Sequence, residues 1–190
     1  MRLSLLKGFW SSTKLLPEQQ ALVRDALSLT RSLKELHPFL QNLLNKDAIR
    51  ANSAIKVKAL CKFIPLRPRV LEINFDLLIP PGFDSHKMRH QIEQLEPPLK
   101  DSKLAWLEKT LDRTHLELAA LLVHEGTHLK EGYTLSRHAD EVKAYQAEWR
   151  FLAHFLQNER YATFAESLVE DLKVAAKEEG LDPNLWLLET

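Results

Sequence analysis

The most informative segment of this 190-residue chain is an apolar run that leads directly into two histidines. It reads Leu118-Ala119-Ala120-Leu121-Leu122-Val123-His124-Glu125-Gly126-Thr127-His128. Its first six residues would be apolar on every side of a helix, which predicts a central, buried helix. Histidines on such a helix need partners, because burying an unpaired polar group is costly. A metal ion is one such partner.

The spacing of the two histidines suits metal binding. Residues four apart lie on one face of a helix, so His124 and His128 can both reach one Zn²⁺ at about 2.0–2.1 Å. Glu125 projects about 100° round the helix, where it can reach a water bound to the metal. The pattern H-E-x-x-H therefore predicts a metal-activated hydrolase.

A third ligand is expected from the segment that follows. Gly132 is a typical residue just beyond a helix C-terminus, and Ser136 is a suitable N-cap for a second helix. Glu141, in the first turns of that helix, lies 13 residues after His128 and is the predicted third ligand. Two histidines and one glutamate leave a fourth position for water, which is the arrangement of catalytic zinc.

Other ligands are compatible with the same pattern. Glu148 lies on the same helix face as Glu141, either as a competing ligand or as an acceptor for the N–H of a ligand histidine. Asp140 would make an aspartate-type site. His138 does not fit a three-histidine motif, because positions 131 and 134 hold glutamate and threonine.

Residues 111–150 resemble the zincin metallopeptidases of the gluzincin type, including a small residue, Ala144, three positions after Glu141. The resemblance implies one zinc ion per chain, held by His124, His128 and Glu141. It further implies that Glu125 is the general base and that the substrate is a peptide or protein.

Two residues depart from the pattern of the gluzincin motif. Gly126 is unusual inside a helix, and we expect it to allow the close approach of a neighbouring strand or of substrate. Lys130 stands where many zincins have an uncharged residue. Five residues are candidates for stabilising the oxyanion beside the metal: His115, Tyr133, Arg137, His138 and Tyr145.

Composition limits the class of protein. Lys+Arg and Asp+Glu both number 26, so the net charge is zero and electrostatics does not predict nucleic-acid binding. A single cysteine excludes an internal disulfide, so we expect a reducing, cytoplasmic location. The sequence contains no run of about 18 apolar residues, so we expect no membrane span. Residues 1–10 lack the features of a signal peptide and are expected to pack on the core. The oligomeric state is left open.

The chain is predicted to form one α+β domain over residues 1–190, mostly helical, zincin-like, with a small antiparallel sheet and a central H-E-x-x-H helix. Residues 1–50 are expected to be helical, with a stripe of leucines from Leu22 to Leu43 interrupted near Pro38. Alternating patterns over 55–63 and 71–79 predict an antiparallel hairpin with Cys61 facing the core. We expect one of these strands to pair with an extended substrate.

The remaining chain is expected to be helical around the site. A short helix is predicted within 83–102, and His86 and His90 are expected to be exposed to solvent. An alternative interpretation is that this segment forms a movable lid. The active-site helix region is placed at 103–131. C-terminal helices are placed over 137–190, one of them spanning about 161–179, with residues 185–188 folding back onto the core.

The leading functional hypothesis is a zinc-dependent metallopeptidase that activates a bound water, with Glu125 as general base. An alternative keeps the metal in a protein that hydrolyses a non-peptide bond, or that is inactive and acts as an interaction module. A third hypothesis is an all-α binding protein without a metal.

Overall fold

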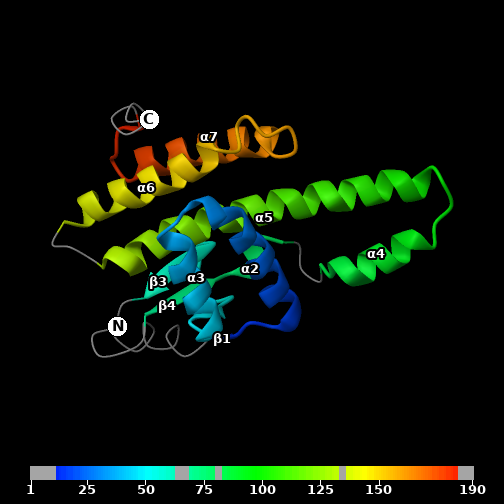
Figure 1. Ribbon diagram of the computed structural model, residues 1–190, viewed down its shortest axis with the longest axis horizontal. Helices are drawn as coiled ribbons and strands as arrows, with labels where there is room; N and C mark the ends of the chain where they lie inside the picture. The colour runs from blue at the N-terminus through cyan, green and yellow to red at the C-terminus, as the bar shows by residue number, and fades with distance from the viewer. Residues whose placement is uncertain (1–11, 63–68, 80–82, 133–135, 184–190) are drawn as a thin grey trace.

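The computed structural model describes residues 12–62, 69–79, 83–132 and 136–183. Within these ranges the chain is mostly helical, with one four-stranded sheet (Figure 1). The elements in order are β1 (Thr13–Lys14), α2 (Pro17–Leu29), η2 (Thr30–Ser32), α3 (Leu36–Asn45), β2 (Ile49–Ala51), β3 (Ala59–Lys62), β4 (Val70–Ile73), η3 (Phe75–Leu77), α4 (Ser85–Glu93), α5 (Leu99–Glu131), α6 (Arg137–Ala153) and α7 (Ala162–Glu178). The predicted α+β class is confirmed.

The sheet has the strand order β1-β2-β4-β3. β3 pairs with β4 in antiparallel register, with Cys61 opposite Leu71, which confirms the predicted hairpin. The prediction of a purely antiparallel sheet is wrong, because β2 runs parallel to β4, although it pairs antiparallel with β1. β1 and β2 also lie in the region predicted to be helical, and strands of two and three residues are too short for a period-two pattern.

The second predicted strand is shorter than expected. β4 ends at Ile73, and Asn74 turns the chain because its side-chain oxygen accepts a hydrogen bond from the backbone N–H of Asp76. The residues after Asn74 therefore form the short helix η3 rather than more strand.

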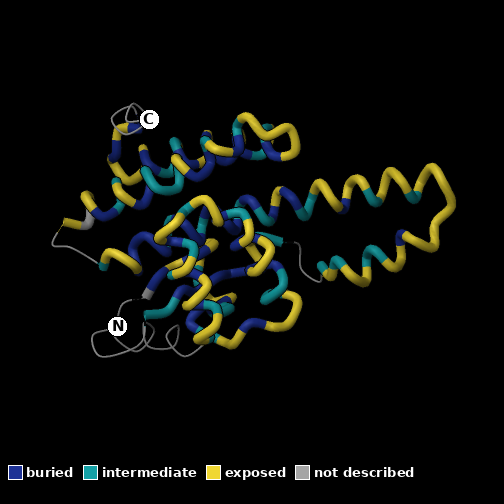
Figure 2. Tube along the Cα trace, viewed as in Figure 1, coloured by how far each residue is buried: buried dark blue, intermediate teal, exposed yellow. Residues whose placement is uncertain are grey.

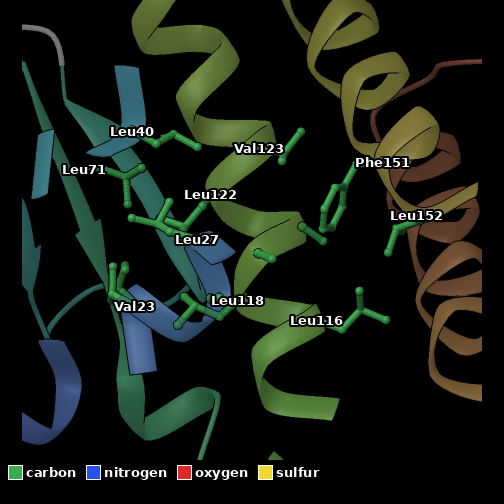
Figure 3. Close-up of a cluster of buried hydrophobic side chains, with 14 of the residues drawn as sticks. Val23, Leu27, Leu40, Leu71, Leu116, Leu118, Leu122, Val123, Phe151 and Leu152 are labelled. Carbon is green, nitrogen blue, oxygen red and sulfur yellow. The ribbon is translucent and has the colours of Figure 1, made fainter. Parts of the chain in front are cut away.

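The leucine stripe before the sheet forms two helices. The break predicted near Pro38 falls at η2 and residues 33–35, just before α3 begins at Leu36. Pro38 thus lies in the first turn of α3, where its missing N–H costs no helical hydrogen bond. Both helices pack on α5, as Leu27 and Leu40 show in the core close-up (Figure 3).

Helix α5 is the long axis of the molecule. Its 33 residues span about 50 Å at 1.5 Å per residue, and it begins four residues before the predicted boundary at 103. Its C-terminal half is buried, with the sheet, α2 and α3 on one side and Phe151 and Leu152 of α6 on the other (Figure 3). The predicted central, buried helix is confirmed for this half.

The N-terminal half of α5 lies beside α4 and extends away from the sheet and from α6 (Figure 2). The short helix predicted within 83–102 is α4, and His86 and His90 are exposed on it, as expected.

Helix α5 ends as predicted. Gly132 has a φ of 76°, which favours glycine, and Ser136 caps α6 by accepting a hydrogen bond from the N–H of Ala139. The guanidinium of Arg69 donates to the carbonyl oxygens of Leu129 and Lys130, which have no helical partner at a helix C-terminus.

The helix predicted over 161–179 is α7, which ends before Gly180, a glycine with a φ of 78°. Leu181 beyond it is buried. The predicted tail at residues 1–10 and the segment 185–188 lie outside the described residues. A search of the described helices found none with the length and apolar character of a transmembrane segment.

Candidate metal centre

Three side chains predicted as ligands converge between α5 and α6. Nε2 of His128 lies 3.3 Å from Oε2 of Glu141, and Nε2 of His124 lies 3.5 Å from the same oxygen. Among the described residues, this group alone brings three His, Cys, Asp or Glu donor atoms close enough for one ion, all within 4.8 Å of one another. The turn between Gly132 and Ser136 brings Glu141 back to the helix that carries both histidines.

These distances fit a small tetrahedral cation. Ligand atoms at about 2.0–2.1 Å from a tetrahedral ion lie roughly 3.3–3.5 Å from one another. The two nitrogen-to-oxygen distances fall in that range. Two imidazole nitrogens and one carboxylate oxygen are also the donor set of catalytic zinc sites. The side chains present therefore fit a zinc ion.

Glu148 contacts the other nitrogen of the first histidine. Its Oε2 lies 2.9 Å from Nδ1 of His124, so Nδ1 donates to Glu148 and Nε2 is directed towards Glu141. Glu148 was predicted to be either a competing ligand or an acceptor for the N–H of a ligand histidine, and in the structure it makes the second of these contacts. Asp140 is buried in α6 but does not belong to the converging group.

The surrounding charges hold the histidine and the carboxylate together. Burial lowers the pKa of His124, but the hydrogen bonds to Glu141 and Glu148 outweigh burial and raise that pKa to about 10. The hydrogen bond from His124 lowers the pKa of Glu141 against the opposing effect of burial. The ring of Tyr145 packs edge-on against His124 with the centroids 4.8 Å apart.

Glu125, the predicted base, contacts the edge strand of the sheet. Its Oε2 accepts a hydrogen bond of 2.8 Å from the backbone N–H of Cys61 in β3. The backbone N–H of Asn74 donates to the carbonyl of Lys58, so these two residues form a hydrogen-bonded pair. Such pairs alternate along an antiparallel ladder, so the pair of Cys61 and Leu71 is not hydrogen-bonded and the N–H of Cys61 points away from β4. The side chain of Cys61 is buried, as predicted.

The close approach of α3 explains why position 126 is a glycine. A Cβ atom at this position would lie 2.6 Å from Cδ2 of the buried Leu40 in α3. The expected close approach is therefore present, but the partner is a leucine side chain of α3 rather than a strand or substrate. Lys130, the other departure from the motif, forms an ion pair of 2.5 Å with Glu35 at the start of α3.

The candidates for oxyanion stabilisation separate into three groups. Tyr145 lies against His124, and His138 lines a cavity of about 440 Å³ together with Glu141 and Glu179. His115 is on the opposite face of α5 and lines a different cavity of about 550 Å³, so it does not belong to the metal centre. Tyr133 and the side chain of Arg137 lie outside the described residues.

The sequence reasoning missed three contacts of the site: the amide of Cys61, the guanidinium of Arg69 and the side chain of Leu40. Cys61 is 64 residues from Glu125, and Arg69 is 60 residues from Leu129. No local pattern signals such pairs, because they depend on how the sheet and α3 pack on α5.

Comparisons with family models, with curated proteins and with solved structures produced no match to this chain. The likeness to zincins therefore rests on the motif and on the site described above.

Proposed function

We propose that this protein is a zinc-dependent hydrolase that cleaves peptide bonds. The observation that carries the proposal is the convergence of His124, His128 and Glu141, whose donor atoms lie within 4.8 Å of one another and whose two nitrogen-to-oxygen distances fit a tetrahedral ion. A histidine of this group is further oriented by Glu148, as ligand histidines usually are by a carboxylate. A structural zinc site has four protein ligands, whereas this group has three.

A zinc ion held here would polarise the scissile carbonyl and make water a stronger nucleophile. Glu125 follows His124 directly and is not a member of the ligand group, which suits a general base. In this role Glu125 accepts a proton from the attacking water and passes it to the leaving amine. The N–H of Cys61 fixes one carboxylate oxygen of Glu125, so the orientation of the base is set by the edge strand.

The same edge strand suits an extended polypeptide. β3 is at the end of the sheet, and its outward N–H at Cys61 donates to the base, so a peptide paired at this amide would replace Glu125 there. A peptide that adds to this edge would place its backbone next to Glu125, which is a common way for proteins to hold extended chains. This supports a peptide over a small-molecule substrate.

One observation favours the alternative of an inactive zinc protein. The carboxylate of Glu125 already has a hydrogen-bond partner in the sheet, which would hold it away from water if the contact persisted with substrate present. The two hypotheses differ in whether replacing Glu125 changes hydrolysis.

The experiment has two stages. Metal content is measured on protein purified without chelators, and we expect about one zinc per chain in the wild type and little in His128→Ala. The double variant His86→Ala/His90→Ala is the control, because it removes an exposed histidine pair with the same spacing from α4. A wild type without zinc would contradict the proposal.

The second stage separates an enzyme from an inactive site. A peptide library is digested with the zinc-loaded wild type and with Glu125→Gln, which keeps the size of the side chain. We expect cleavage to fall by roughly 10²–10⁴-fold in the variant. Equal cleavage by both proteins would show that Glu125 is not the base, and no cleavage by either would favour the inactive protein.

A further inference from the structure

The arm formed by α4 and the first half of α5 carries a cationic face with an aromatic centre. The side chains on this face are exposed: Leu99, Lys103, Trp106, Lys109 and Arg113. At 100° per residue, the other four all lie within about 60° of Trp106 round the helix. Leu99 and Trp106 each keep 51% of their surface exposed, which is high for large apolar side chains. We call these five residues the α5 cationic face.

No carboxylate neutralises this face. Among the described residues, none lies within ion-pair distance of Lys103, Lys109 or Arg113. The nearby acidic residues point elsewhere, since Glu108 pairs with Arg89 of α4 and Asp112 forms two hydrogen bonds with Arg160.

One contact joins this face to α7. Nζ of Lys109 lies 5.9 Å from the ring centroid of Phe164 in α7. The face is thus positive and partly aromatic, and its cations are free to meet a negatively charged partner.

The α5 cationic face is in line with the metal centre. Trp106 precedes His124 by 18 residues, which is about five full helical turns, so both side chains leave α5 in the same direction. The distance along the helix axis is about 27 Å. Between them, Arg113 is exposed, and Glu117 and Leu121 are partly exposed. Figure 2 shows this half of α5 as the exposed extension of the helix that reaches the site.

We propose that the α5 cationic face is a docking surface for an acidic segment of a polypeptide substrate, one that carries an aromatic or aliphatic residue between its carboxylates. Its role as a substrate-docking surface rests on the proposed hydrolase function. The charge of the face selects carboxylates, and Trp106 with Leu99 offers an apolar contact of the kind that dominates binding energy. An extended peptide would cover 27 Å with about eight residues at ~3.3 Å each.

The size and charge of the surface favour a polypeptide over other anionic partners. Recognition of anionic lipid by charge typically uses about four to eight clustered Lys or Arg residues, and this face has three. Nucleic-acid binding draws on a basic domain, whereas this chain has zero net charge. A second copy of the same face would bring like charges together.

The first test measures binding with cleavage disabled. The full chain carrying Glu125→Gln is titrated against a dye-labelled peptide with a tryptophan between glutamates, and against the same peptide with lysines in place of the glutamates. We expect only the acidic peptide to bind, and its affinity to fall at least about tenfold with Trp106→Ala or with Lys103→Glu/Lys109→Glu. Lys87→Glu, which reverses an exposed charge on α4, is the control and should leave the affinity within about twofold.

Several results of this titration would overturn the proposal. These are equal binding of the acidic and basic peptides, an equal loss in the Lys87→Glu control, or no binding of the acidic peptide. Vesicles containing phosphatidylserine and a single-stranded oligonucleotide are titrated in parallel. If either binds in a Trp106-dependent way and the peptide does not, the partner is an anionic membrane or a nucleic acid instead.

The second test separates docking from hydrolysis. Two substrates share one cleavage segment, and one also carries the acidic segment about eight residues away, placed on either side in separate peptides. We expect the anchored substrate to show a KM at least about tenfold lower, and Trp106→Ala to remove that advantage while the plain substrate is cleaved as before. Cleavage of both with equal KM would contradict docking and leave the hydrolase in place. Binding without cleavage of either would contradict the hydrolase and the substrate role together, and leave only a binding surface.

Discussion

The carboxylate of Glu148 lies 2.9 Å from Nδ1 of His124, on the side of the imidazole ring opposite the nitrogen that faces Glu141. One histidine is therefore held between two glutamates of the same helix, seven residues apart. With a metal ion bound, this contact would keep the remaining proton on Nδ1 and leave Nε2 of His124 to the ion. Glu148 thus acts on the site through His124.

Replacing Glu148 should weaken metal binding without abolishing it. We expect Glu148→Gln to lower zinc affinity by about 10–100-fold, because His124 loses the acceptor that orients its ring. Glu141→Gln, which removes a ligand oxygen, should lower it more. Competition with a chromogenic chelator measures both, with the exposed Glu166→Gln on α7 as the control. If Glu148→Gln weakened binding as much as Glu141→Gln, Glu148 would have to be a ligand itself.

The amide of Cys61 should matter for hydrolysis but not for metal content. Cys61→Pro removes the N–H that donates to Glu125 and leaves the ladder with β4 intact, because that N–H points away from β4. We expect cleavage to fall by about tenfold with zinc still bound, since the base loses its fixed orientation. Peptide cleavage and zinc content are measured on the same preparation.

Cys61→Ala is the matched control for that variant, because it shortens the side chain and keeps the N–H. Leu60→Pro is a second control: its N–H belongs to the ladder with β4, so we expect a lower melting temperature rather than a specific loss of activity. Equal cleavage by Cys61→Pro and Cys61→Ala would show that the contact does not orient Glu125.

The part of the site that could be predicted from sequence is the part built from neighbouring residues. The 3.6-residue period places His124 and His128 on one face, and Gly132 and Ser136 mark where α5 ends and α6 begins. These signals are local, so the return of Glu141 towards the histidines follows from them. The choice between Glu141 and Glu148 does not, because both lie on one face of α6 and only the packing of the two helices decides between them.

The parts that could not be predicted depend on contacts between distant segments. β1 and β2 are too short to show a periodic pattern in the sequence. They are strands because they pair onto the sheet of β4 and β3, which lie later in the chain. Gly126 looked like a cost to the helix, and only the position of Leu40 shows why the side chain is missing. The amide of Cys61 reaches Glu125 because an edge strand lies along α5, which no residue pattern near position 125 indicates.

The substitution Gly126→Ala should change the free energy of unfolding in opposite directions with leucine and with alanine at position 40. In the wild type, a Cβ would lie 2.6 Å from Cδ2 of Leu40, and overpacking costs about 1–3 kcal/mol, against a gain of about 1 kcal/mol in helix propensity. We expect Gly126→Ala to lower the free energy of unfolding by up to about 2 kcal/mol. In a Leu40→Ala background the same change should raise it, because the space is then available. Denaturant melts of the four proteins give the coupling, and an additive result would contradict the steric explanation.

The stability of the protein stripped of metal should fall as the pH rises from about 6.5 to 10. The folded-state pKa of His124 is raised to about 10 from an ordinary 6.5, so its contribution is fully present below about 6.5 and is lost as the pH rises through the folded value. The pKa of Glu141 is lowered from 4.5, so its contribution is present above that value and is lost in acid. The measurement is the melting temperature against pH for the stripped wild type and for Glu141→Gln/Glu148→Gln, which removes both partners of His124. We expect the advantage of the wild type to be largest between about pH 5 and 6.5 and to shrink towards pH 10. A difference that stayed constant across this range would show that the two glutamates do not hold the proton on His124.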